Sequence, residues 1–241
     1  MNSLFDTLQT MPYPGRTIIV GAGPGGQHGV LYAITGRSPS SQARRLVIDE
    51  QEQKIFVRPT DEDTLKTGNP DLLVYAAIMC AADGIAVSNG KQTGDVFKAV
   101  QAESCVSLVM HTGLTGWEFE PDEPNWTPRI SGCIAQNAAL SVLKRAENGE
   151  VIRNTFEFPL IAGQGNMVST YTGVNTNPLP SFAGEPLDVA LPFENSREAA
   201  EALYAALAPA AGADDFRVSA AAAFTGPDGT VNMFVKNRHA E

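Results

Sequence analysis

Residues 17–35 read TIIVGAGPGGQHGVLYAIT, and the fold depends on whether a helix or a strand comes after the glycines. Three of them have the spacing of a dinucleotide-binding fingerprint: Gly21, Gly23 and Gly26. That fingerprint needs a helix directly after the glycines, because the helix N-terminus binds the pyrophosphate. Here Gly29 interrupts the segment and the apolar residues alternate with period two. We therefore predict a hairpin turn over residues 22–26 between two strands, with the dinucleotide-binding fold and its oxidoreductase chemistry as the alternative.

Short apolar segments separated by turn signals continue along the chain. They predict further strands at residues 46–49, 54–57, 72–77, 85–88, 129–135, 140–145, 152–158, 216–224 and 231–235. Helices are expected at residues 93–101, at 103–111, and from Asn195 to about Leu207, where Asn195 and Glu198 have the spacing of a capping box. Many strands with few helices indicate an α+β protein with largely antiparallel sheets. No low-complexity linker divides the chain, so we expect one domain over residues 1–241.

Composition restricts the class of protein. The 241 residues are 43% hydrophobic and carry a net charge of −10, which is ordinary for a globular protein and argues against a nucleic-acid partner. The first ten residues show no signal peptide, and no apolar run is long enough to cross a membrane. Three dispersed cysteines, expected to be buried, form neither a metal motif nor a disulfide framework: Cys80, Cys105 and Cys133. We expect a cytoplasmic protein without a metal or cofactor.

Residues 117–132, WEFEPDEPNWTPRISG, contain most of the candidate chemistry. Four carboxylates lie close in sequence to an arginine, and three prolines restrict the backbone between them. A stiff loop of this kind presents acid, base and anion-binding groups. The alternative is a solvated acidic loop without a chemical role.

Six short segments occur in an order that resembles a known family. They are Tyr13-Pro14-Gly15-Arg16, Gly36-Arg37-Ser38, Asn89-Gly90-Lys91-Gln92-Thr93, Phe119-Glu120-Pro121-Asp122, Thr127-Pro128-Arg129-Ile130-Ser131-Gly132 and Asn177-Pro178-Leu179-Pro180-Ser181-Phe182. Together they resemble the archaeal-type IMP cyclohydrolases and their bacterial relatives, most strongly over residues 13–186.

The resemblance implies a four-layer αββα sandwich like that of the N-terminal-nucleophile hydrolases, without their nucleophile. It also implies ring closure of 5-formamidoimidazole-4-carboxamide ribonucleotide (FAICAR) to IMP, the last step of purine biosynthesis. The partner would be this small purine-precursor nucleotide, no cofactor would be needed, and a homo-oligomer would be expected.

The resemblance also implies functional residues. The positions that match the family's catalytic chemistry are Arg37, Tyr75 and Glu120. Glu120 would be the base or would orient the carboxamide, Tyr75 would donate to the formyl oxygen, and Arg37 would stabilise charge. The positions expected to bind substrate are Arg16, Asn89, Gln92, Asn125 and Arg129.

Each assignment has a structural alternative. Tyr75 could equally be a structural tyrosine of the core, and Asn89 precedes a glycine, as in a hairpin turn. Arg129 would equally serve as one member of a structural ion pair with a loop carboxylate, and Arg37 as a solvated turn residue. The chain departs from the family after Tyr75, where Ala76-Ala77-Ile78-Met79-Cys80 replaces an expected Asn and Arg. A repurposed nucleotide-binding relative without catalysis is therefore the second hypothesis.

Overall fold

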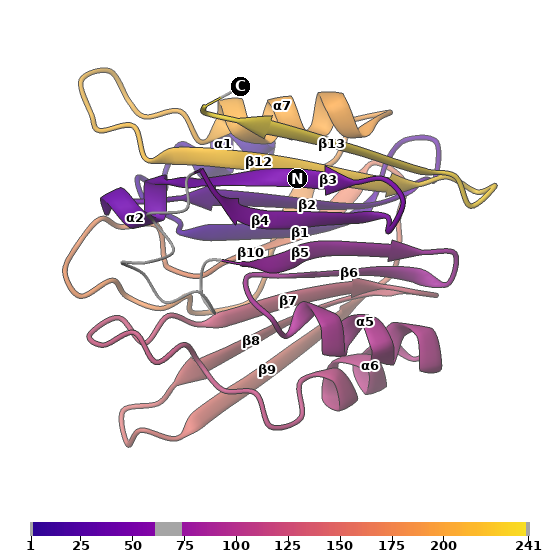
Figure 1. Cartoon of the computed structure of the whole chain (residues 1–241), viewed down its shortest axis with the longest axis horizontal. Coiled ribbons are helices and arrows are strands. Elements are labelled where there is room, and N and C mark those ends of the chain that lie inside the picture. Colours follow the sequence, from indigo (N-terminus) through magenta and orange to yellow (C-terminus); the bar gives the residue numbers. More distant parts are fainter. Residues whose placement is uncertain (1, 61–73, 240–241) are drawn as a thin grey trace.

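The structure is a computed structural model that describes residues 2–60 and 74–239. It contains two β-sheets, and every pairing between neighbouring strands is antiparallel. Figure 1 shows the strands of both sheets, with α7 at one side of the molecule and α5 and α6 at the other. The expected α+β class with antiparallel sheets is therefore confirmed.

The first sheet has six strands in the spatial order β11-β10-β1-β2-β12-β13. Their bounds are β1 Arg16–Ala22, β2 His28–Thr35, β10 Gln164–Ser169, β11 Leu187–Ala190, β12 Arg217–Thr225 and β13 Val231–Asn237. The second sheet has seven strands in sequence order, from β3 to β9. Their bounds are β3 Arg44–Asp49, β4 Lys54–Pro59, β5 Tyr75–Ala81, β6 Gly84–Ser88, β7 Arg129–Ile134, β8 Ala138–Arg145 and β9 Val151–Phe158.

The glycine-rich segment after β1 is a hairpin turn, as predicted, and the dinucleotide-binding alternative is wrong. β1 and β2 pair directly across it, with Ala22 opposite His28. Gly21 has a packing role, because a Cβ atom on it would lie 2.2 Å from the carbonyl oxygen of Gln164 on the neighbouring strand β10. The glycine thus permits a close approach between strands.

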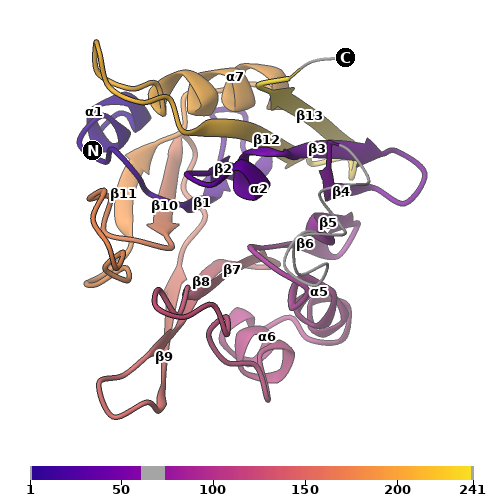
Figure 2. The ribbon, with the colours of Figure 1, turned by 60° about the vertical axis from the view of Figure 1, so that its left-hand side comes forward.

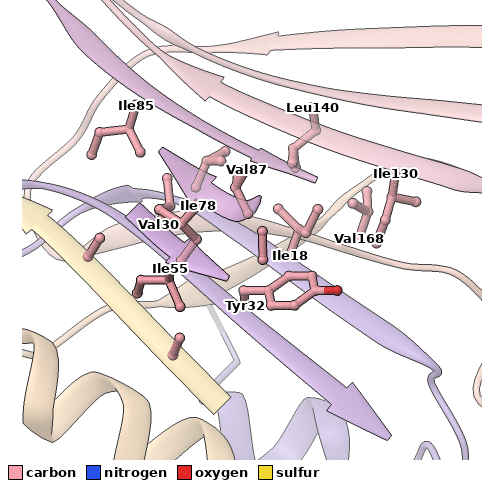
Figure 3. Close-up of a cluster of buried hydrophobic side chains, with 14 of the residues drawn as sticks. Ile18, Val30, Tyr32, Ile55, Ile78, Ile85, Val87, Ile130, Leu140 and Val168 are labelled. Atoms are coloured by element: carbon pink, nitrogen blue, oxygen red, sulfur yellow. The ribbon is translucent and has the colours of Figure 1, made fainter. Parts of the chain in front are cut away.

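The main hydrophobic core lies between the two sheets. β1 contributes Ile18 and Val20 to it, and β5 contributes Ile78 from the opposite sheet. Figure 3 shows Ile18 and Ile78, from the two sheets, in one cluster together with Tyr32 of β2. Ile19, between the first two, points the other way into a second core. β1 and β2 are therefore buried on both faces, whereas the period-two alternation of apolar residues after Gly26 predicts a strand buried on one face only.

Helices cover the outer faces of both sheets (Figure 2). The first sheet packs against α1 and α7, and the second against α5 and α6. Their bounds are α1 Leu4–Leu8, α2 Pro39–Gln42, α5 Thr93–Ala102, α6 Val106–Gly113 and α7 Ser196–Ala206. In the described part of the chain, none of these helices is long and apolar enough to cross a membrane.

Several local predictions need correction. The capping box at Asn195 is only half formed: its side chain accepts from the Glu198 N–H at 3.0 Å, but the Glu198 carboxylate accepts from Glu194 instead. Cys105 is exposed rather than buried. α1, α2, β10 and β11 were not predicted. Residues 72 and 73 of one predicted strand lie outside the described residues.

Candidate active site

A cavity of about 350 Å³ opens where strand ends from both sheets meet. Arg16 begins β1 in the first sheet, whereas Arg44 begins β3 in the second. The walls are formed by Tyr13, Arg16, Arg37, Ser38, Ser40, Ser41, Arg44, Glu120, Asp122, Asn125, Thr127, Tyr171 and Leu179. This volume is at the lower end of the range for small-ligand pockets.

Glu120 is the most deeply buried carboxylate of the 117–132 loop, at 2% exposure. Its N–H donates to the carbonyl oxygen of Thr127 at 2.8 Å, which fixes the backbone. Burial raises the pKa of the carboxyl, although Arg16 and Arg129 lower it. Glu118 and Glu123 of the same loop are exposed. The solvated-loop alternative therefore holds for those two residues but not for Glu120.

Asn89 and Gln92 lie behind Glu120 rather than on the cavity wall. The Asn89 amide donates to the carbonyl oxygen of Pro128 at 2.9 Å and lies 3.5 Å from the Glu120 carboxylate. Its oxygen accepts from the Ile130 N–H at 2.9 Å and from the Gln92 amide at 3.0 Å. Both side chains thus hydrogen-bond to other protein groups. They are placed to position Glu120 and its loop, and they do not line the cavity.

The hairpin alternative for Asn89 is wrong, because β6 ends at Ser88 and α5 begins at Thr93. The residues between them form the entry to a helix instead of a turn between strands. Asn89 therefore connects three separate segments: this helix entry, the 117–128 loop and β7.

Arg129 closes the network on the other side of Glu120. Its Nη1 donates to the Gln92 oxygen at 3.1 Å and lies 3.9 Å from the Glu120 carboxylate. The guanidinium also covers the ring of Trp117 at 5.0 Å. Burial lowers the pKa of Arg129, with Glu120 acting in the opposite direction. The ion pair considered for Arg129 is therefore present, and its partner is Glu120, the candidate base.

Arg16, which is half-buried, and Arg44, which is buried, place two positive charges at the cavity. Burial is the largest single influence on the pKa of Arg16 and acts to lower it, but Glu120 together with the tyrosines Tyr75, Tyr32 and Tyr171 raises the pKa overall. The Nε of Arg16 has no hydrogen-bond acceptor within residues 2–60 and 74–239. Burial lowers the pKa of Arg44, and the like charge of Arg16 lowers it further. Two neighbouring guanidinium groups with a spare donor form a site for an anionic ligand.

Arg37 lies at the rim of the same cavity. Its Nη1 donates to the Asn175 side chain at 3.0 Å and to the carbonyl oxygen of Thr176 at 2.8 Å. Its guanidinium lies 5.1 Å from the ring centroid of Tyr13. These contacts hold the side chain in place and contradict the alternative of a freely solvated turn residue.

Tyr75 begins β5 and is 4% exposed. Its hydroxyl lies 2.8 Å from that of Tyr32, which comes from β2 in the opposite sheet. Arg16 and Arg129 both interact electrostatically with Tyr75 and with Glu120. Glu120 and Tyr75 therefore interact with the same two arginines, but Tyr75, unlike Glu120, does not line the cavity.

Asn125 lines the cavity, but its oxygen accepts from the Leu179 N–H at 3.1 Å and so holds the 177–182 connector. Trp126, the next residue, has a φ of 47°, which is rare for a residue with a side chain. This turn brings Thr127 back to Asp122, whose carboxylate accepts from the Thr127 N–H at 2.6 Å. Sequence reasoning assigned no role to Tyr13, Tyr32, Arg44, Asp122, Thr127 or Tyr171.

The fold thus places Arg16 and Arg44 with the buried carboxylate of Glu120 at one cavity between the ends of strands from both sheets. The family model described as IMP cyclohydrolase-like protein matches residues 13–229 of the 241. The chain therefore belongs to the IMP cyclohydrolase-like family, which confirms the resemblance and extends it past residue 186. A search of curated proteins found no match.

Proposed function

We propose that this protein closes FAICAR to IMP with loss of water, in de novo purine biosynthesis. The observation that carries the proposal is the buried carboxylate of Glu120 at a cavity that Arg16, Arg37 and Arg44 also line. Membership of the IMP cyclohydrolase-like family supports the same reaction. The chemistry needs the carboxamide nitrogen held against the formyl carbon, and orientation alone supplies roughly 7–11 kcal/mol of such barriers.

Glu120 would take the proton from the carboxamide nitrogen as it attacks. A general base works best with a pKa near the working pH, and burial moves the pKa of Glu120 in that direction. Asn89 and Arg129 would keep the carboxylate aimed at the nitrogen, because both contact it from behind.

Tyr75 would donate a proton to the formyl oxygen as the C–N bond forms, which gives a ring hydroxyl. That hydroxyl would leave as water with the proton that Glu120 took, while the formamido nitrogen returns its proton to Tyr75 and the C=N bond forms. Tyr32 is fully buried, and Tyr75 is the hydrogen-bond partner of its hydroxyl. Either hydroxyl can donate in this pair. In the proposed reaction the Tyr32 proton is directed at the Tyr75 oxygen. This direction leaves the proton of Tyr75 for the ligand.

The arginines would bind the phosphate and stabilise the negative charge that develops on oxygen. Arg16 has a free Nε donor, and Arg37 lies beside serines at positions 38, 40 and 41 on the cavity wall. Such charge-assisted donors act strongly in a partly dry pocket.

The fold proposal is a single domain with the four-layer arrangement of N-terminal-nucleophile hydrolases. Helices on both outer faces of two stacked antiparallel sheets support it. The second functional candidate is a nucleotide-binding relative without catalysis. It is favoured by the segment after Tyr75, where Ala77, Ile78 and Cys80 belong to the core between the sheets and supply no polar group.

One experiment separates the two. The pure protein is incubated with FAICAR, and IMP is followed by chromatography. Formation of IMP that stops in Glu120→Gln supports the cyclohydrolase. No IMP, with nucleotide still raising the Tm, supports the non-catalytic relative.

A further inference from the structure

A chain of hydrogen bonds runs along one wall of the cavity, from Tyr171 through Thr127 to Asp122. The Tyr171 hydroxyl lies 2.6 Å from Thr127 Oγ1, and Thr127 Oγ1 donates to the Asp122 carboxylate. The same carboxylate accepts from the Thr127 N–H at 2.6 Å. All three residues line the cavity, with Thr127 fully buried and Tyr171 2% exposed.

The chemistry of these groups fixes the direction of the chain. An ionised carboxylate only accepts, so the single proton of the Thr127 hydroxyl is given to Asp122. Tyr171 must then donate to Thr127, because Thr127 has no second proton to offer. Burial raises the pKa of Tyr171 to about 12, so the hydroxyl keeps its proton at neutral pH. The Tyr171 oxygen is left with a lone pair.

The ring of Tyr171 is held in one orientation. It stacks on Tyr13 with ring centroids 5.9 Å apart. On another side it packs against Gly15, where an added Cβ would lie 2.6 Å from Tyr171 Cδ2. The residue therefore presents a fixed acceptor.

Arg16 supplies the complementary donor. It interacts electrostatically with Tyr171, and its buried Nε lacks an acceptor in the described part of the chain. An acceptor and a donor at one wall match a ligand group that carries both, such as a hydroxyl or an amide.

We propose that Tyr171 is a specificity residue whose oxygen accepts a hydrogen bond from an O–H or N–H group of the bound nucleotide. A ligand that offers only an acceptor there is rejected, because two lone pairs would face each other without a proton. The inference rests on the proposed function for the identity of the ligand as a purine-type nucleotide. That nucleotide has two sources of the donor: the ribose hydroxyls and the carboxamide nitrogen, which becomes N1–H in IMP.

The test is isothermal titration of wild type and Tyr171→Phe with four nucleotides: IMP, 2′-deoxy-IMP, 3′-deoxy-IMP and 1-methyl-IMP. Tyr171→Phe removes one oxygen and should weaken IMP binding by about fivefold to tenfold. The analogue that lacks the recognised donor should bind wild type more weakly and should lose no further affinity in Tyr171→Phe. Which analogue behaves this way identifies the source of the donor.

Substitutions of Thr127 test the direction of the hydrogen bonds from Tyr171 to Asp122. Thr127→Val removes the acceptor of the Tyr171 proton, so Tyr171 becomes free to donate and the penalty for an acceptor-only analogue, such as 2′-O-methyl-IMP, should shrink. Thr127→Ser keeps the hydroxyl and should keep the penalty. Tyr204→Phe is a matched control, because Tyr204 lies on α7 beside Arg217 and does not line the cavity.

The outcomes separate this inference from the proposed function. Suppose that wild type binds IMP, but the affinity loss caused by Tyr171→Phe adds to the loss caused by every analogue. Tyr171 then accepts no hydrogen bond from the ligand, and this inference is overturned while the proposed function stands. If wild type does not bind IMP, the proposed function fails, and the inference fails with it.

Discussion

Replacing Glu120 by glutamine should stabilise the protein at neutral pH and remove its activity. The carboxyl is 2% exposed, and burial is the largest influence on its pKa, which is raised from 4.5. Arg16 and Arg129 favour the ionised form, but they do not restore the ordinary pKa. The ionised carboxylate is therefore less stable in the folded protein than in water, and a neutral amide of the same shape avoids that cost.

Two opposing contributions set the size of the effect. Arg129 Nη1 lies 3.9 Å from the carboxylate, and unit charges at that separation attract by about 4 kcal/mol at an effective dielectric constant of about 20. Taking a carboxylate out of water costs several kcal/mol, and the raised pKa means that this cost exceeds the attraction. We expect Glu120→Gln to gain about 1 kcal/mol in free energy of unfolding at pH 7, or about 2–4 °C in Tm.

The gain should depend on pH. The folded-state pKa of Glu120 lies above the unfolded value, so the folded wild type binds more protons between the two values. Its stability therefore falls as the pH rises through that window. Below the unfolded pKa, near about 4.3, Glu120 is protonated in both states and the advantage of Glu120→Gln should vanish.

The assay is thermal unfolding from pH 4 to pH 8, with kcat for IMP formation measured on the same preparations. Glu157→Gln is the control: hydrogen bonds from Ser107 and Asn137 lower the pKa of this exposed carboxyl, so its removal should not stabilise the protein at pH 7. Glu120→Gln should lower kcat by at least about 10²-fold. A lower Tm at pH 7 would refute the view that burial dominates at Glu120, and an unchanged kcat would remove its role as base.

Four further substitutions test neighbouring parts of the site. Tyr75→Phe should lower kcat by at least about 10²-fold. Tyr32→Phe should lower kcat by about tenfold, because Tyr32 only orients Tyr75. If both variants form IMP at the wild-type rate, neither tyrosine has the proposed role. Arg37→Ala should lower kcat/KM by about tenfold or more through lost charge-assisted bonds, and an unchanged kcat/KM would place Arg37 outside the reaction. Gly15→Ala should destabilise the fold by at least about 2 kcal/mol in denaturant unfolding, because φ is 77° and the new Cβ would meet Tyr171; a wild-type midpoint would contradict this packing.

The order of the strands along the chain was largely predictable, because local patterns of apolar and turn residues indicate it. The period-two alternation after Gly26 distinguished a hairpin from a helix, and β1 and β2 pair as expected. Burial of both faces of these strands was not predictable, because the covering helix α7 comes about 160 residues later. β10 and β11 were missed for a similar reason: their polar and glycine residues form strands only beside β1.

The site was predictable in location but less so in detail. The resemblance selected Glu120 and Arg129, and the structure brings them to 3.9 Å. It also selected Asn89, whose buried amide turns out to hold the loop in place and does not line the cavity. Tyr171 was missed because its role arises from contact with Thr127, 44 residues away, and no local pattern reports such a contact.

The proposed reaction is tested most directly by an experimental structure with IMP bound. We predict one nucleotide in the cavity lined by Arg16 and Glu120, with its six-membered ring within hydrogen-bond distance of both the Glu120 carboxyl and the Tyr75 hydroxyl. A nucleotide bound elsewhere, or one whose ring reaches only one of these two groups, would contradict the proposed roles of both residues.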